Sequence, residues 1–396
     1  MNKRAIIILS AIFLLIVGTL GFLLFTRKGA TPTNQGNNGN NNTPTPTPTP
    51  TLEATPTPTP TVTTGTGGPA KLLSEEVLSP VLFYKGDGIS YFNSQGQLFQ
   101  LDLRIVGNSA SVSNKRQIQI TPRPGISKVL WPSTGNSFIA QTDAGSKQSW
   151  AFYDGSRQVY VELPPQITAL AWMPDATKII YVWQGQNGKN SLNISNPDGS
   201  GYSKLADMYN SDTNISIAPD GKNILFYGNS NPTDKNPITV VTSDGKIFKS
   251  VVKDGYNLGA LWAPDSKRFV FTKRDPQTQN FNLWMGNVLV DDAKNLGLNT
   301  TIDKVLWSQD GRFLYVSASN TSSGQSRESI YKVNTETLEK TEVVSGGSFS
   351  PREMFLSLNS EVLFFRNVND NSLYSVPLGN LTTSNSSSVN ILNSAP

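Results

Sequence analysis

Two residue types are missing from this chain of 396 residues: it contains no cysteine and no histidine. Without them the protein has no thiol nucleophile, no histidine-containing triad, no thiolate or imidazole zinc site and no histidine-bound haem. The absence of cysteine also excludes disulfides and a lipid-modified cysteine anchor. Three sequence motifs are missing as well: the Gly-x-Ser-x-Gly elbow, the Gly-x-x-x-x-Gly-Lys phosphate loop and a dinucleotide-binding Gly-x-Gly-x-x-Gly between a strand and a helix. We therefore expect no cofactor and no metal ion.

Most of the chain carries little net charge. The formal net charge is +4, but much of it comes from four residues that flank an apolar segment near the N-terminus: Lys3, Arg4, Arg27 and Lys28. The rest is nearly neutral, and its basic residues occur as isolated doublets rather than in runs. We therefore expect no nucleic-acid partner.

Residues 5–25 carry no charge and read AIIILSAIFLLIVGTLGFLLF. A helix of about 20 apolar residues is long enough to cross a bilayer. The run is longer than the apolar part of a signal peptide and lacks a small-x-small cleavage site at its end, although a cleaved signal peptide is the alternative. We predict a cytoplasmic N-terminus at residues 1–4, a transmembrane signal anchor at 5–26, and the remainder outside the cytoplasm, periplasmic or at the cell surface.

Residues 27–70 contain almost no large apolar side chains. An Asn/Gly block is followed by alternating Thr-Pro units at 43–50 and 55–60. Such a segment cannot bury a core, and alternating proline favours polyproline II at about 3.1 Å per residue. We predict a disordered linker that acts as a spacer of up to ~100 Å, whose threonines are candidates for glycosylation.

Residues 71–396 show short apolar runs separated by turn residues and no sustained helical periodicity, which predicts an all-β domain. One pattern recurs, in which an apolar pair often ending in Trp precedes a turn and a second apolar strand. Its copies begin at Val129, Leu170, Ser216, Ala260 and Val305, with a degenerate copy at Phe355. Repeats of 40–50 residues with about four short strands each are typical of β-propeller blades.

The number of blades depends on how the ends of the repeat region are assigned. A four-strand unit from Val81 to Thr121 precedes the first Trp copy, which gives about seven four-stranded blades. Six is the alternative, if the strand at Val81–Tyr84 completes the last blade from outside. Val389–Leu392 is a candidate closing strand, and the Ser/Asn-rich segment before it is predicted to be frayed.

Three copies carry a specific resemblance. They read Trp172-Met-Pro-Asp-Ala-Thr-Lys178, Ala218-Pro-Asp-Gly-Lys222 and Trp262-Ala-Pro-Asp-Ser-Lys267, each followed by an apolar strand. This element resembles the repeat of TolB-type β-propellers, over roughly Ser79 to Leu378. The resemblance implies that a partner binds on a propeller face; fold analogy carries no more than that. The first and last copies depart from the pattern.

The tryptophans divide into two groups. Trp131, Trp172, Trp262 and Trp307 occupy one repeat position, which indicates packing between blades rather than ligand binding. The others, Trp150, Trp183 and Trp284, lie off that position and are candidates for a binding surface. The repeated Asp residues fit turn chemistry better than calcium binding or acid/base catalysis.

These observations favour a protein that is not an enzyme. The main hypothesis is a membrane-tethered propeller that binds or scaffolds an envelope protein or polysaccharide, because a rigid ring with variable loops suits that task. The alternative is an envelope glycan- or peptide-acting hydrolase with a pair of carboxylates in the propeller pocket. A purely structural, self-associating envelope component is the third reading.

Overall fold

The computed structural model describes residues 68–378 except 84, 119, 134–135, 145–146, 210–212, 229–233, 247 and 321–326. The described residues form 27 strands, β1 to β27, and two short 3-10 helices, η1 (Gln186–Gly188) and η2 (Ile302–Lys304). The predicted membrane anchor and linker lie outside them, except for the last few linker residues. No helix within the described part of the chain is long and apolar enough to cross a membrane.

The strands pair with their sequence neighbours in antiparallel sheets. The first sheet consists of β2 (Leu78–Leu82), β3 (Gly88–Phe92), β4 (Leu98–Val106) and β5 (Ser109–Ile118). The second consists of β6 (Ile126–Leu130), β7 (Phe138–Ala144), β8 (Lys147–Asp154) and β9 (Val159–Glu162). The third is β10 (Ile167–Trp172), β11 (Ile179–Trp183), β12 (Asn190–Ser195), β13 (Ser203–Met208).

The middle of the chain forms a run of seven strands: β14 (Thr213–Ile217), β15 (Asn223–Gly228), β16 (Asn236–Thr242), β17 (Phe248–Trp262), β18 (Arg268–Arg274), β19 (Phe281–Asn287) and β20 (Lys294–Asn299). The long strand β17 is shared, because its first half pairs with β16 and its second half with β18. Counting β17 in both, this run is two four-stranded sheets.

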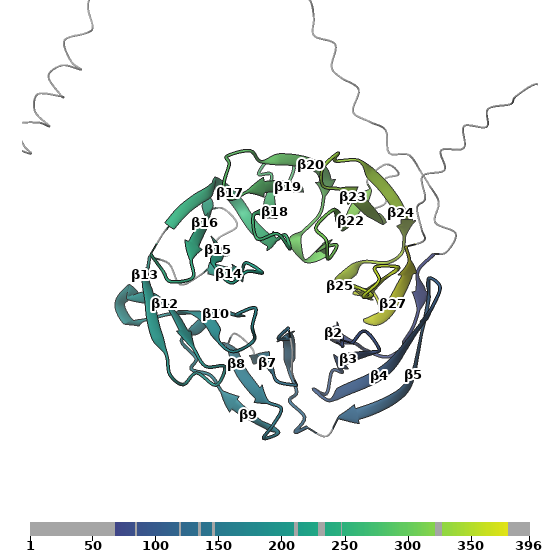
Figure 1. The fold of residues 1–396 in the computed structure, drawn as a ribbon, viewed down its shortest axis with the longest axis horizontal. Helices are drawn as coiled ribbons and strands as arrows, with labels where there is room; N and C mark the ends of the chain where they lie inside the picture. Colours follow the sequence, from purple (N-terminus) through teal and green to yellow (C-terminus); the bar gives the residue numbers. More distant parts are fainter. Residues whose placement is uncertain are drawn as a thin grey trace, which may run out of the picture. The chain divides into compact units, whose positions relative to one another are not determined.

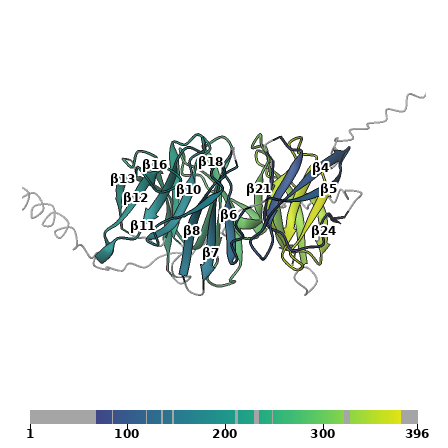
Figure 2. The same ribbon diagram turned by 90° about the horizontal axis from the view of Figure 1, so that it is seen from below.

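The last two sheets complete the series. One consists of β21 (Val305–Trp307), β22 (Phe313–Asn320), β23 (Arg327–Asn334) and β24 (Lys340–Gly347). The other consists of β25 (Pro351–Leu356), β26 (Val362–Asn367) and β27 (Ser372–Pro377), together with β1 (Ala70–Lys71). Figure 1 shows the sheets arranged radially as a ring, with β2, β10, β14 and β25 nearest its centre and β5, β9 and β13 outside. Seen from the side in Figure 2, the strands run across the thickness of the ring.

Apolar clusters lie between neighbouring sheets all the way around this ring. Each of the seven clusters in the described residues combines side chains of two adjacent sheets. The cluster that joins the last sheet to the first contains Tyr91, Leu101 and Phe364. A single sheet cannot bury both of its faces, so this stacking supplies the core.

The turns between the first and second strands share one geometry in five sheets. A backbone N–H donates to the carbonyl three residues earlier: Ala176 to Met173, Gly221 to Ala218, Ser266 to Ala263, Gly311 to Ser308 and Ser360 to Ser357. The donor residue has positive φ each time, between 56° and 72°. In the Pro-Asp-Gly copy, Asp220 Oδ1 also accepts from the N–H of Lys222 at 3.0 Å. These aspartates therefore form turns, as their sequence context indicates.

The N-terminal strand β1 closes the ring. Ala70 and Lys71 pair with Ser375 and Tyr374 of β27, so β1 is the outer strand of the last sheet. The segment considered for this place, Val81–Tyr84, overlaps β2 instead, which pairs with β3. The other candidate, Val389–Leu392, lies outside the described residues.

Removing β1 is expected to loosen the ring. A chain that starts at residue 74 lacks β1 and the half-buried Leu72 and Leu73, which pack between the last and first sheets. At roughly 1 kcal/mol for each half-buried leucine, the free energy of unfolding should fall by about 2 kcal/mol relative to a chain that starts at residue 68. The freed edge of β27 should also promote self-association, because unpaired strands template pairing. Urea unfolding and light scattering measure both effects; equal stability of the two chains would contradict closure by β1.

Candidate functional site at the ring centre

The innermost part of each sheet has one recurrent position, three residues before the repeat tryptophan or the residue in its place. We call these seven residues the inner positions: Ser79, Lys128, Ala169, Asn214, Gly259, Lys304 and Glu353. Five of them are polar or charged, although they adjoin strands that are otherwise largely apolar. A polar residue at this place in the innermost strand is not required by the core.

Irregular backbone directs several of these residues. The pairing of β2 with β3 shifts between Leu78 and Val81, and that of β25 with β26 shifts between Arg352 and Phe355. Within these bulges Ser79 has φ 49° and Glu353 has φ 51°. Non-glycine residues rarely take this left-handed conformation, and such strain persists where the surroundings enforce it, often at functional sites.

Glu353 and Lys128 bring three sheets together. Glu353 Oε2 accepts from the N–H of Ser79 at 3.2 Å and from Nε of Arg366 at 2.8 Å. Lys128 interacts electrostatically with Glu353, although the first sheet separates their own sheets in the ring order. Side chains of sheets that are not neighbours in the ring come close enough for such an interaction only near the ring centre.

Lys128 differs from Arg352, Arg366 and Lys304 in having no ion-pair partner among the described residues. It makes no ion pair or hydrogen bond with any described residue, although water reaches its side chain. The surrounding protein lowers the pKa of its amine through desolvation, and the nearby Glu353 offsets this only in part. An amine with a lowered pKa can accept a proton closer to neutral pH than an ordinary lysine can.

Arg352 lies beside Glu353 in the chain and contacts the next connection. Its Nε is 2.8 Å from Oδ2 of Asp303, and its Nη1 donates to Oγ1 of Thr301 at 3.2 Å. Asp303 and Thr301 belong to the segment around η2, between β20 and β21. Arg352 is partly exposed, so its guanidinium remains within reach of a ligand.

Next to Asp303, Lys304 forms an ion pair with Glu328 at the start of β23, and the two side chains are only 11% and 13% exposed. Glu328 also accepts from Ser317 Oγ at 2.8 Å and from Ser350 Oγ at 3.1 Å. This pair is almost buried and its carboxylate accepts from three donors, which suits it to holding neighbouring connections in place rather than to contacting a ligand.

The ring centre therefore combines carboxylates held by cations with one uncommitted amine. Glu353, Asp303 and Glu328 each have an arginine or lysine partner within 4 Å. Arg352 is a cation that can bind an anionic group, and Lys128 supplies a proton acceptor. In the described part of the chain, no three acidic side chains gather as a metal-binding group.

The three tryptophans predicted as a binding surface lie in three different sheets. Trp150 is 6% exposed and packs between the second and third sheets, with its indole N–H unpaired. Trp183 and Trp284 are half-buried; Trp284 stacks on Phe271, and the amine of Lys273 lies 4.4 Å from its ring centre. The structure does not bring them together, and Trp150 presents no face to solvent.

The repeat tryptophans tie sheets together, as their shared position indicates. Three indole N–H groups donate to a carbonyl of the preceding sheet at 2.9 Å: Trp131 to Ser79, Trp172 to Leu130 and Trp262 to Ser216. Their recurrence thus has a structural explanation. Trp307 takes the same place, with the Arg268 guanidinium over its ring.

The sequence carries a signal for the ring-centre residues that our prediction overlooked. The tetrapeptide Lys-Val-Leu-Trp occurs twice, at 128–131 and 304–307. Its lysine stands at the inner position in both copies, and aligning the repeats on tryptophan places Glu353 there too. The bulges that turn the positions inward have no comparable local signal.

Comparison with known proteins identifies the fold. No protein-family model and no curated protein sequence matches the chain. Among solved structures, the β-propeller domain of Cps50 (Swd1) from Myceliophteria thermophila has a TM-score of 0.54 at 8% identity, covering 78% of this chain and 98% of that one. The described domain is a β-propeller.

Two other solved structures bear on the predictions. Oligogalacturonate lyase in complex with manganese has a TM-score of 0.56 at 12% identity, covering 77% of this chain and 90% of that one. TolB from Acinetobacter baumannii has a TM-score of 0.42 at 14% identity, covering 73% and 78%. At this level the TolB similarity carries no argument, so the part of the predicted resemblance that is supported is the propeller fold.

The prediction that the chain is not an enzyme is overturned. The propeller shares its fold with a lyase, so the fold does not argue against catalysis. That prediction relied on missing motifs from other folds, whereas propeller residues of a site come from several sheets and leave no continuous motif. At identities this low, the similarity shows the fold alone.

Proposed function

We propose that this chain is a membrane-tethered enzyme of the cell envelope, whose propeller binds an acidic polymer at the ring centre and cleaves it. An acidic glycan is the first candidate substrate and an acidic peptide the second. Lys128 acts as the proton acceptor, Arg352 neutralises an acidic group of the substrate, and Glu353 holds the site through Ser79 and Arg366. This reading replaces the pair of carboxylates in the alternative hypothesis with an amine and a carboxylate.

One observation carries the proposal. Lys128 stands at an inner position without an ion-pair partner in the described residues, whereas Glu353, Asp303 and Glu328 each pair with a cation; desolvation, offset in part by Glu353, also lowers the pKa of its amine. A lysine kept only for solubility or packing would not need this environment, and perturbed amines are enriched at functional sites. The acidic polymer named for the lyase with the same fold supports a glycan as the first class to test.

The remaining parts of the proposal come from the sequence. We propose that the propeller has seven blades, with β1 in the last one, and that residues 5–26 anchor it in the membrane with the propeller outside the cytoplasm. The Thr-Pro linker then allows the ring centre to reach polymers at a distance from the bilayer. An envelope polysaccharide is the partner that this geometry serves best.

A substrate screen with the purified full-length protein tests the proposal. Acidic and neutral glycans and acidic peptides are incubated with the protein, and cleavage is followed by new reducing ends, by unsaturated products and by mass spectrometry. We expect cleavage of an acidic polymer and not of its neutral counterpart, because Arg352 favours anionic groups. Cleavage of neutral polymers alone, or of none in the panel, would contradict the proposal.

A further inference from the structure

A second site lies between the first two sheets and begins just beyond Ser79 along β2. It is a cleft of about 840 Å³, lined by residues of β2 to β5, by the β6–β7 turn and by the end of β8. Pockets for small ligands usually measure about 300–1,000 Å³. The cleft begins at Val81, two residues after Ser79 or roughly 7 Å along the strand, and Trp131 of its wall donates its indole N–H to the Ser79 carbonyl at 2.9 Å, so the two sites are neighbours, although none of the inner positions lines the cleft.

One residue explains why the sheets part here. The second strand of each sheet has a position that faces the following sheet. In six sheets it holds an apolar or aromatic side chain that is at most 2% exposed: Ile139, Ile180, Leu225, Val270, Tyr315 and Phe364. In the first sheet it holds Ser90, which lines the cleft. A serine leaves the volume that a large side chain fills in the other six.

The floor of the cleft offers two uncommitted hydroxyls. Ser90 and Tyr153 are each 4% exposed, both line the cleft, and neither side chain forms a hydrogen bond with a described residue. Burial raises the pKa of Tyr153, so its hydroxyl remains a donor at all ordinary pH values. Buried hydroxyls normally have hydrogen-bond partners. A ligand that supplies these partners gains binding free energy, because it removes the cost of leaving the hydroxyls unpaired.

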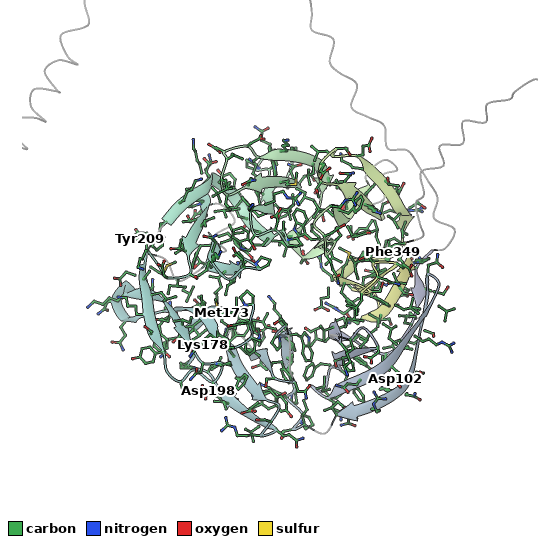
Figure 3. All side chains as sticks on the ribbon, in the orientation of Figure 1. Asp102, Met173, Lys178, Asp198, Tyr209 and Phe349 are labelled. Carbon is green, nitrogen blue, oxygen red and sulfur yellow. The ribbon has the colours of Figure 1, made fainter. Side chains whose placement is uncertain are left out.

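The walls and rim of the cleft define the chemistry of that ligand. Half-buried Trp131 supplies an aromatic wall, and Phe92 and Phe138 pack against its ring at 5.9 and 5.2 Å between centroids. Gln100 and the ion pair of Asp102 with Arg116 provide planar polar groups; Asp102 is labelled in Figure 3, in the outer part of the first sheet. The charged side chains of the rim balance, two acidic and two basic.

We infer that this cleft binds a neutral saccharide unit, with the apolar face of the sugar ring against Trp131 and sugar hydroxyls paired with Ser90 and Tyr153. An aromatic wall, free hydroxyls and planar polar groups match a sugar ring, which is apolar on its faces and polar around its edge. The balanced charge favours an uncharged unit. The inference is independent of cleavage at the ring centre.

A substitution that fills the cleft tests the inference without disturbing the fold. Ser90→Leu places in the first sheet the side chain that Leu225 contributes to the fourth. The full-length protein and this variant are titrated with cellobiose, maltose and diacetylchitobiose, followed by calorimetry and tryptophan fluorescence. We expect the wild type to bind at least one of them saturably and the variant to bind it about tenfold more weakly or worse, because the cavity is filled and a hydroxyl is lost.

Two further measurements make the result specific. The Ser90→Leu variant should unfold at a temperature no lower than the wild type, so that lost binding is not lost folding. Lys128→Met should keep saccharide binding at the cleft, whatever it does to cleavage, which separates failure of this inference from failure of the proposed enzyme. Equal binding by wild type and Ser90→Leu would overturn the inference. So would the absence of binding to all three sugars up to about 10 mM.

Discussion

Replacing Lys128 by methionine is expected to lower the turnover of the acidic polymer by about 10²–10⁴-fold, the usual contribution of a positioned proton acceptor. Methionine keeps much of the length of the lysine side chain and its apolar stem but cannot take up a proton. Because Lys128 has no ion-pair partner in the described residues, its loss leaves no unpaired carboxylate behind, and the variant should fold normally. Initial rates at saturating substrate measure the effect.

The pH dependence distinguishes a proton acceptor from a simple anion-binding charge. Desolvation lowers the pKa of Lys128 from the ordinary value of 10.5, and a base acts only when it is unprotonated. The wild-type rate should therefore rise with pH and level off below the pH at which an ordinary lysine would titrate. Lys128→Arg should bind the polymer but not cleave it, because arginine stays protonated.

A matched control keeps this test specific. Lys267 is an exposed lysine in the turn after Trp262, at the opposite end of the strands, so Lys267→Met should change the rate by less than twofold. If Lys128→Arg cleaves as fast as the wild type, Lys128 acts through its charge alone. If Lys128→Met retains full turnover, the reaction does not use this residue at all.

Most of the propeller was predictable because its repeat leaves local signals. The aromatic and β-branched runs, the Pro-Asp-Gly turns and the spacing of the tryptophans each follow from short-range chemistry, and the structure places strands and turns at these residues. The closing strand β1 was not predictable in this way. Ala70 and Lys71 have no strand pattern of their own, and they become a strand only because β27 presents an unpaired edge.

The candidate site was harder to predict, for a different reason. Lys128 and Glu353 are 225 positions apart in the chain and influence each other electrostatically only because the ring closes, and their backbones are turned by bulges that depend on the partner strand. Trp150 is buried, which was not predictable, since the sequence does not show that this side chain faces the neighbouring sheet. Ser90 likewise stands out only after the strands are aligned by their observed pairing.

The other large effect concerns stability and the ion pair of Lys304 with Glu328. The two side chains are almost buried, and two serine hydroxyls donate to the same carboxylate. Taken out of water together, such a pair contributes little net stability compared with apolar residues of the same size, but removing one partner leaves the other charge buried and uncompensated. The cost of a single substitution should therefore exceed the value of the pair itself.

Lys304→Met is accordingly expected to lower the free energy of unfolding by about 3–5 kcal/mol, measured by urea unfolding at neutral pH. The double variant Lys304→Met with Glu328→Gln should recover a large part of this loss, because glutamine is uncharged, accepts from one of the two serine hydroxyls through its amide oxygen and can donate to the other through its amide N–H. Additive losses in the double variant, or a loss below about 1 kcal/mol in the single one, would mean that water reaches this pair. Recovery would show that the three connections around η2, β23 and β25 are held by one buried charge pair, which keeps Asp303 and Arg352 in position at the ring centre.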